Sequence, residues 1–132
     1  MLVLATVLFV GYFGVARSQE VKVALSGSQE IPPVSTQASA TGVITVAADK
    51  SVRGSVTVSG INATAAHIHE APAGTNGPIV IPLTKTSDNV WSLPEGAKLT
   101  DAQYESYKAG NLYYNVHSAA YKGGEIRGQI RP

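Results

Sequence analysis

Residues 66–83 have the sequence AHIHEAPAGTNGPIVIPL, which joins an alternating segment, a loop rich in proline and glycine, and a continuous apolar run. Residues two apart in a β-strand point to the same face of the sheet. His67 and His69 therefore share one face, while Ile68 points to the other. Residues 72–78 predict a loop. Residues 79–83 predict a second strand, which Pro82 ends or places at a sheet edge.

The third and last histidine of the chain occurs in a similar setting. Residues 113–117 have the sequence YYNVH, so Val116 faces one way and His117 the other. If Ile68 and Val116 belong to the core, all three imidazoles lie outside it, where a ligand or metal could reach them. A His-X-His pair can also be two exposed polar residues of an amphipathic strand. Because every histidine of the chain lies in such a context, and imidazole is the commonest side-chain metal ligand, we favour a metal site.

The rest of the chain also predicts short strands separated by glycine and proline. We expect a strand at 21–25, a long strand at 35–48 with a bulge or bend at Gly42, and a hairpin with 52–58. Further strands are expected at 61–69, 79–83, 111–117 and 125–130, with a short hairpin arm within 84–92. One helix is expected over 101–109, with Thr100 as its N-cap and Gly110 at its C-terminal end. The predicted class is all-β: an antiparallel barrel or sandwich of about eight strands with one short helix.

Composition narrows the class of protein further. The 132 residues suffice for one domain. There is no cysteine to form a disulfide, so an apolar core must stabilise the fold. The net charge is +1 and the basic residues are scattered, which gives no support for nucleic-acid or membrane-surface binding. Nothing in the sequence specifies an oligomeric state.

The N-terminal segment differs from the rest of the chain. Residues 1–16 carry no charge and include an apolar run that glycines interrupt. We expect 1–18 to be a signal peptide or an N-terminal anchor and 19–132 to form the domain, secreted or periplasmic. Asn62-Ala63-Thr64 fits a glycosylation acceptor, which matters only in a eukaryotic secretory host.

Two motifs resemble the CHRD domain, first described in chordin. They are HIHEAPAG at 67–74 with NGPIV at 76–80, and NVH at 115–117 with GGEIRGQI at 123–130. The resemblance covers about residues 21–130. It implies an extracellular domain and little specific chemistry.

The same motifs resemble, more distantly, copper/zinc superoxide dismutase, a Greek-key β-barrel with copper on its outer wall. That resemblance implies that His67, His69 and His117 are copper ligands and that Arg127 guides the superoxide anion to the metal. The family's fourth, bridging histidine and its zinc ligands have no counterpart here. The resemblance therefore implies one copper ion at most.

The residue types at the expected site agree with copper or zinc. Three imidazoles with an open position suit either metal. A blue-copper site is disfavoured because the chain has no cysteine and its only methionine is Met1. Ile126 in the core would turn Arg127 outward, where it could attract small anions or form an ordinary surface ion pair with Glu125 or another carboxylate. Glu70 and Glu125 are candidates to hold an imidazole N–H, and Tyr113, Tyr114 and Tyr121 are expected to cover the strand of His117.

Three functions follow as hypotheses. The first is a secreted mononuclear copper protein with superoxide dismutase activity, an oxidoreductase whose substrate is a small anion. The second is a non-catalytic extracellular binding or matrix module with a structural metal or none. The third is a three-histidine zinc hydrolase, for which Glu70 is the only evident general base, so zinc is the less favoured cofactor.

Overall fold

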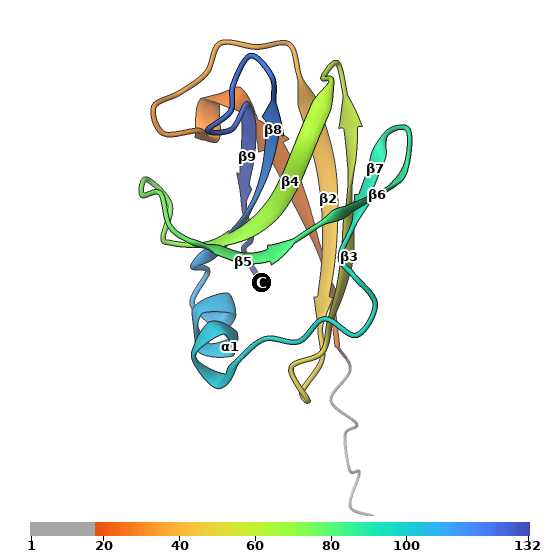
Figure 1. Cartoon of the computed structure of the whole chain (residues 1–132). Coiled ribbons are helices and arrows are strands. Elements are labelled where there is room, and N and C mark those ends of the chain that lie inside the picture. The colour runs from red at the N-terminus through yellow and green to blue at the C-terminus, as the bar shows by residue number, and fades with distance from the viewer. Residues whose placement is uncertain (1–17) are drawn as a thin grey trace, which may run out of the picture.

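The structure, a computed structural model, describes residues 18–132 and is dominated by nine β-strands (Figure 1). In chain order the strands are β1 (Glu20–Ser26), β2 (Ser39–Val46), β3 (Val52–Ser59), β4 (Ala63–Glu70), β5 (Ile79–Pro82), β6 (Thr84–Ser87), β7 (Val90–Ser92), β8 (Leu112–Ser118) and β9 (Ile126–Gln129). Within these residues one 3-10 turn, η1 (Gly27–Gln29), follows β1, and the helix α1 (Asp101–Lys108) precedes β8.

The strands form one antiparallel sheet in the order β5-β4-β8-β9-β1-β2-β3-β7-β6. Its two end strands, β5 and β6, are consecutive in the chain with only Leu83 between them. The sheet therefore curls into a nearly closed barrel, as Figure 1 shows. This confirms the predicted all-β antiparallel barrel with one short helix. Its Greek-key connectivity stays a prediction.

The barrel interior is filled by the apolar members of the alternating strands. Ile68, Val116 and Ile126 are completely buried in this core. The face assignment made from the sequence is thus confirmed: the histidines of β4 and β8 project from the opposite face of their strands, and all three remain partly exposed. Burial of a side chain such as Ile68 stabilises the fold by about 1.5–3 kcal/mol.

The helix begins where its N-capping residue predicts. The Thr100 side chain accepts a hydrogen bond from the Gln103 backbone N–H, and the Gln103 side chain accepts one from Thr100, forming a capping box. Gly110 has a φ of +79°, the left-handed conformation that closes many helices. The helix ends at Lys108, one residue before the predicted end.

The prediction for Gly42 is wrong. The long strand expected at 35–48 spans only Ser39–Val46, and it pairs with β1 and β3 without a break in register. A Cβ atom on Gly42 would lie 3.0 Å from Cδ2 of Tyr114, so this glycine makes room for an aromatic ring and introduces no bend. A register shift occurs instead between Ile68 and His69, where β4 pairs with β5.

The expected signal peptide or anchor, 1–18, lies outside the described residues except for Ser18. Among residues 18–132, no helix has the length and apolar character needed to cross a membrane.

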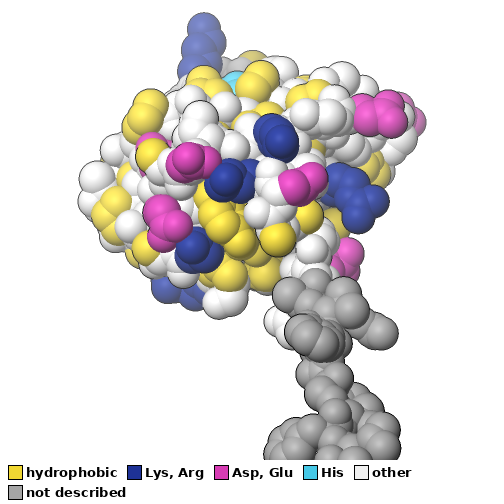
Figure 2. Space-filling view, turned by 90° about the horizontal axis from the view of Figure 1, so that it is seen from below, with side chains coloured by type: hydrophobic (Ala, Val, Ile, Leu, Met, Phe, Trp, Pro, Cys, Tyr) yellow, Lys and Arg dark blue, Asp and Glu magenta, His cyan; other side chains and the backbone are white. Residues whose placement is uncertain are grey.

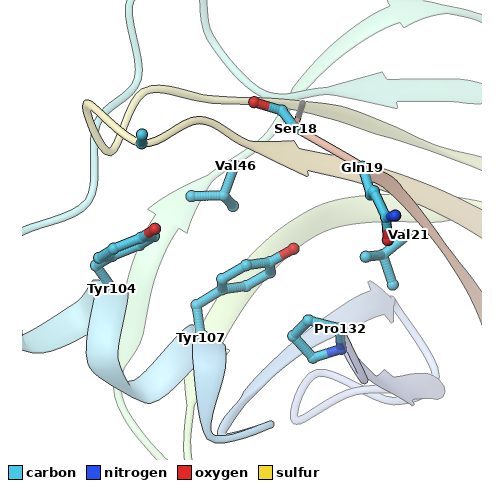
Figure 3. A pocket seen from close by; sticks show the side chains of 8 residues that line it. Ser18, Gln19, Val21, Val46, Tyr104, Tyr107 and Pro132 are labelled. Atoms are coloured by element: carbon cyan, nitrogen blue, oxygen red, sulfur yellow. The ribbon is translucent and has the colours of Figure 1, made fainter. Parts of the chain in front are cut away.

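The end of the barrel beside α1 carries a cleft without histidines. Figure 3 shows Tyr104 and Tyr107 of the helix lining this cleft together with Val21, Val46 and Pro132. Seen from this end, in Figure 2, apolar surface is surrounded by intermixed basic and acidic side chains. The cleft offers little metal-binding chemistry, so we consider the histidine face of the barrel as the functional site.

Candidate metal centre

Two neighbouring strands bring the three histidines together. In the antiparallel pairing of β4 with β8, His67 is opposite Asn115, His69 is opposite Tyr113, and His117 is opposite Ala65. Side chains directly and diagonally opposite on one face of a sheet lie within contact distance. Two histidines two residues apart on β4 and one on β8 therefore meet on the outer face of the barrel.

The histidine cluster is tight enough to bind a single ion. The Nδ1 atom of His67 lies 3.0 Å from Nε2 of His117. The imidazole of His67 is 4.8 Å from that of His117 and 5.4 Å from that of His69, measured between ring centroids. One ring nitrogen from each histidine can be chosen so that all three lie within 4.8 Å of one another. An ion bonded to all three would require only small adjustments, because metal–imidazole bonds are about 2.0–2.1 Å.

Backbone carbonyls fix the orientation of two of the imidazoles. The Nδ1 atom of His69 lies 2.9 Å from the Gly77 oxygen, and Nδ1 of His117 lies 2.8 Å from the Lys122 oxygen. A carbonyl oxygen can only accept, so each Nδ1 carries a hydrogen, and Nε2 of the neutral ring keeps its lone pair. This is the arrangement in which an outer hydrogen bond orients a metal-binding histidine. The partners are carbonyls, so Glu70 and Glu125 do not hold these two N–H groups.

The free nitrogen of His69 has no partner. Its Nε2 atom is buried and makes no hydrogen bond of good geometry within residues 18–132, although the Asn115 side chain lies close enough to affect the pKa of the ring. A buried acceptor without a donor is unusual in a folded protein, and a bound ion or an ordered water would satisfy it. The donor set of this cluster therefore fits a transition-metal ion that prefers imidazole.

Two of the three histidines, His67 and His69, are also held in the protonation state that binds metals. Burial, followed by the nearby charges of His117 and His69, lowers the pKa of His67 to about 4. Burial also lowers the pKa of His69, although its hydrogen bond to Gly77 opposes the shift. Both imidazoles are neutral at pH 7, so their lone pairs are available to a cation.

Asn115 and Glu30 lie beside the cluster and were not predicted from the sequence. The Asn115 amide donates a hydrogen bond to Glu30, while its own Oδ1 is buried without a partner. Glu30 is only 5% exposed, and this burial raises its pKa to about 7, against the opposing effects of Asn115 and Arg127. Asn115 has the same odd-numbered spacing as His117 and could have been placed on this face from the sequence. Glu30 precedes Ile31-Pro32-Pro33, in which nothing indicates a buried carboxylate.

The expectation that Arg127 is exposed is wrong, although its face was predicted correctly. Arg127 pairs with Asn115 across β8 and β9 and lies on the histidine face, yet it is only 1% exposed. Its guanidinium donates to the backbone oxygens of Thr75 and Pro72 and to the Gln129 side chain. The 72–78 loop covers this part of the sheet, which is why an outward-facing arginine is buried.

Neither ion pair found within residues 18–132 includes Arg127, so the predicted alternative, a surface salt bridge to Glu125 or another carboxylate, is also wrong. The Glu125 carboxylate instead accepts hydrogen bonds from Ser118 and Thr36. Arg127 is therefore part of the site's packing and does not present its charge to solvent.

The fold and the site define an antiparallel β-barrel domain with a three-histidine cluster on its outer face. Residues 21–130 match the CHRD domain, and the chain belongs to this family. Comparison with curated proteins and with solved structures finds no match. The predicted similarity to copper/zinc superoxide dismutase stays a prediction.

Proposed function

We propose that this CHRD domain binds one copper ion through His67, His69 and His117, and that the loaded site converts superoxide to oxygen and hydrogen peroxide. The observation that carries the proposal is the unpartnered, buried Nε2 of His69 beside two further imidazoles. A buried acceptor without a donor costs about 1–3 kcal/mol, which a bound ion would offset.

The choice of copper rests on the ligand types. Neutral imidazoles suit both copper and zinc. A hydrolytic zinc site would also need a general base, and within residues 18–132 no carboxylate forms a hydrogen bond with any of the three imidazoles. A redox reaction of superoxide has no such requirement, because its protons can come from solvent.

The chain's own residues would bind the ion and admit the substrate. When bound, copper supplies a one-electron change between its two oxidation states. In the overall reaction one superoxide loses an electron, and a second gains that electron together with two protons from water. His67, His69 and His117 are each partly exposed, so a small anion can approach the cluster from solvent. The buried Arg127 takes no part as an exposed guide for the anion.

We further propose that the domain acts outside the cytoplasm. Membership of the CHRD family, which is typical of extracellular proteins, supports this placement. The apolar sequence of residues 1–16, the basis of the predicted signal peptide or anchor, supports it as well.

The test begins with elemental analysis of protein purified from its native compartment. We expect close to one copper per chain. The copper-loaded protein should then remove superoxide faster than the same concentration of aqueous copper, with a ceiling of about 10⁸–10⁹ M⁻¹s⁻¹ set by diffusion. A His117→Ala variant is the matched control. Copper binding without activity above that of aqueous copper would instead identify a non-catalytic module, and no copper binding would refute the metal site.

A further inference from the structure

Arg127, Tyr113 and His69 form a stack across three adjacent strands. The guanidinium carbon of Arg127 lies 3.5 Å from the centre of the Tyr113 ring. The Tyr113 ring is nearly parallel to the imidazole of His69, with an interplanar angle of 7° and centroids 5.0 Å apart. Because β8 lies between β4 and β9, the imidazole and the guanidinium approach the phenol ring from opposite sides.

One loop holds every member of this stack. Its Gly77 oxygen accepts from Nδ1 of His69, and its Gly77 N–H donates to the Tyr113 hydroxyl. The same loop supplies the Thr75 and Pro72 oxygens that accept from Arg127, at 2.9 and 3.2 Å. The position of the imidazole is therefore tied to the guanidinium in two ways, through the ring between them and through the loop.

The charge of Arg127 is retained in the interior. The guanidinium is bonded to carbonyl and amide oxygens and lies on an aromatic face, and these direct partners are uncharged. The buried Glu30 carboxyl is close enough to interact with its charge, and burial raises the pKa of that carboxyl to about 7. Arginine does not lose its proton in proteins. A buried charge acts more strongly and is less screened than one in water. When Glu30 is protonated, the Arg127 charge therefore favours the lower of two charges on an ion bound by the neighbouring imidazoles.

We infer that Arg127 is a positioning residue of the three-histidine site, which through Tyr113 and the 72–78 loop fixes the imidazole of His69 and by its charge favours the reduced form of a bound copper ion. The positioning role is a property of the chain itself. The effect on the oxidation state rests on the proposed function.

The positioning role is tested on metal-free protein by NMR of the imidazole groups. In Arg127→Met we expect His69 to lose the upfield ring-current shift that Tyr113 causes. The Nδ1 proton of His69 should also exchange with water at least tenfold faster. Arg53→Met removes an exposed arginine of β3 and should leave both signals unchanged. If a folded Arg127→Met variant keeps the parent's ring-current shift at His69 and the parent's exchange rate of the Nδ1 proton, the positioning role is overturned.

The effect on oxidation state is tested by measuring Cu(I) and Cu(II) affinities with competing chelators. Arg127→Met should lower the ratio of Cu(I) to Cu(II) affinity by about tenfold, as expected for loss of one nearby charge. Arg127→Lys, which keeps the charge and loses the planar stack, should keep the ratio while weakening both affinities. An unchanged ratio in Arg127→Met would overturn this role. Arg127→Gln, a second neutral variant, gives the same test if the methionine variant does not fold.

A parent protein that binds no copper would refute the proposed function and the oxidation-state role together. The NMR outcome on metal-free protein is independent of that result, so the two failures are distinguishable.

Discussion

The Nδ1 atom of His67 lies 3.0 Å from Nε2 of His117, a hydrogen-bonding distance between residues fifty apart in the chain. Nδ1 of His117 donates to the Lys122 oxygen, so Nε2 of His117 is an acceptor. In the neutral, metal-free cluster His67 must therefore carry its proton on Nδ1. An ion that bonds to this nitrogen must displace the proton to Nε2 of the same ring.

The first prediction is a change of tautomer at His67 without net proton release. Because the pKa of His67 is lowered to about 4, its imidazole is already neutral at pH 7. Nitrogen chemical shifts should show the His67 proton on Nδ1 in metal-free protein and on Nε2 after addition of Cu(I). Calorimetry at pH 8, where an ordinary imidazole is neutral and Glu30 is largely ionised, should show close to zero protons released in buffers of different ionisation enthalpy. Release of a full proton per bound ion would contradict a neutral His67 that only changes its tautomer.

The second prediction concerns the three ligands together. Replacing His67, His69 or His117 with alanine should weaken copper binding by at least tenfold, since each imidazole contributes one metal bond. Chelator competition measures the affinity. Thr57→Ala, at an exposed position of β3, is the control and should bind as the parent does. A triple alanine variant that kept the parent's affinity would show that copper binds elsewhere.

The third prediction uses two adjacent glycines that differ in their surroundings. A Cβ atom on Gly124 would lie 2.2 Å from the Asn115 amide nitrogen and 2.7 Å from Oε1 of Glu30, and its φ is +125°. Gly124→Ala should therefore lower the free energy of unfolding by about 2 kcal/mol or more. A Cβ atom on Gly123 would have none of the surrounding heavy atoms within 4 Å. Gly123→Ala is therefore the matched control and should change the free energy of unfolding little. Urea denaturation measures both, and equal losses would contradict the packing described at Gly124.

Strand periodicity predicted the parts of the site that depend on local geometry. The placement of Ile68, Val116 and Ile126 in the core follows from alternation alone, and the two-residue spacing of His67 and His69 puts them on one face. The start of the helix could also be predicted from the local sequence, because the capping residues adjoin it in the chain.

Contacts between distant segments were not predictable in this way. Alternation gives the face on which Arg127 lies, but not that residues 72–78 fold over that face and bury it. The carbonyls of Gly77 and Lys122 are backbone atoms, which no pattern of side chains identifies as partners of histidines. Glu30 contacts Asn115 across 85 positions of sequence, a pairing that depends on the complete strand order.

The last prediction is a pH dependence of stability due to Glu30. Burial raises the pKa of this carboxyl from an ordinary 4.5 to about 7, so between these values the folded chain binds more protons than the unfolded chain. The free energy of unfolding therefore falls as the pH rises from about 4.5 to about 7. Outside this range, Glu30 causes no further change with pH. Glu30→Gln keeps an acceptor for the Asn115 amide and has no proton to lose. Relative to Glu30→Gln, the parent should lose roughly 2–3 kcal/mol between pH 4 and pH 8.

Urea denaturation of the two proteins at a series of pH values measures this difference. The lowered pKa of His67 acts with the opposite sign, since its stability contribution is lost as the pH falls towards 4. That contribution is present in both proteins and cancels when they are compared. Glu20→Gln, at an exposed position of β1, is the matched control and should follow the parent at every pH. A difference between parent and Glu30→Gln that stays constant from pH 4 to pH 8 would show that the Glu30 carboxyl titrates normally and lies in contact with water.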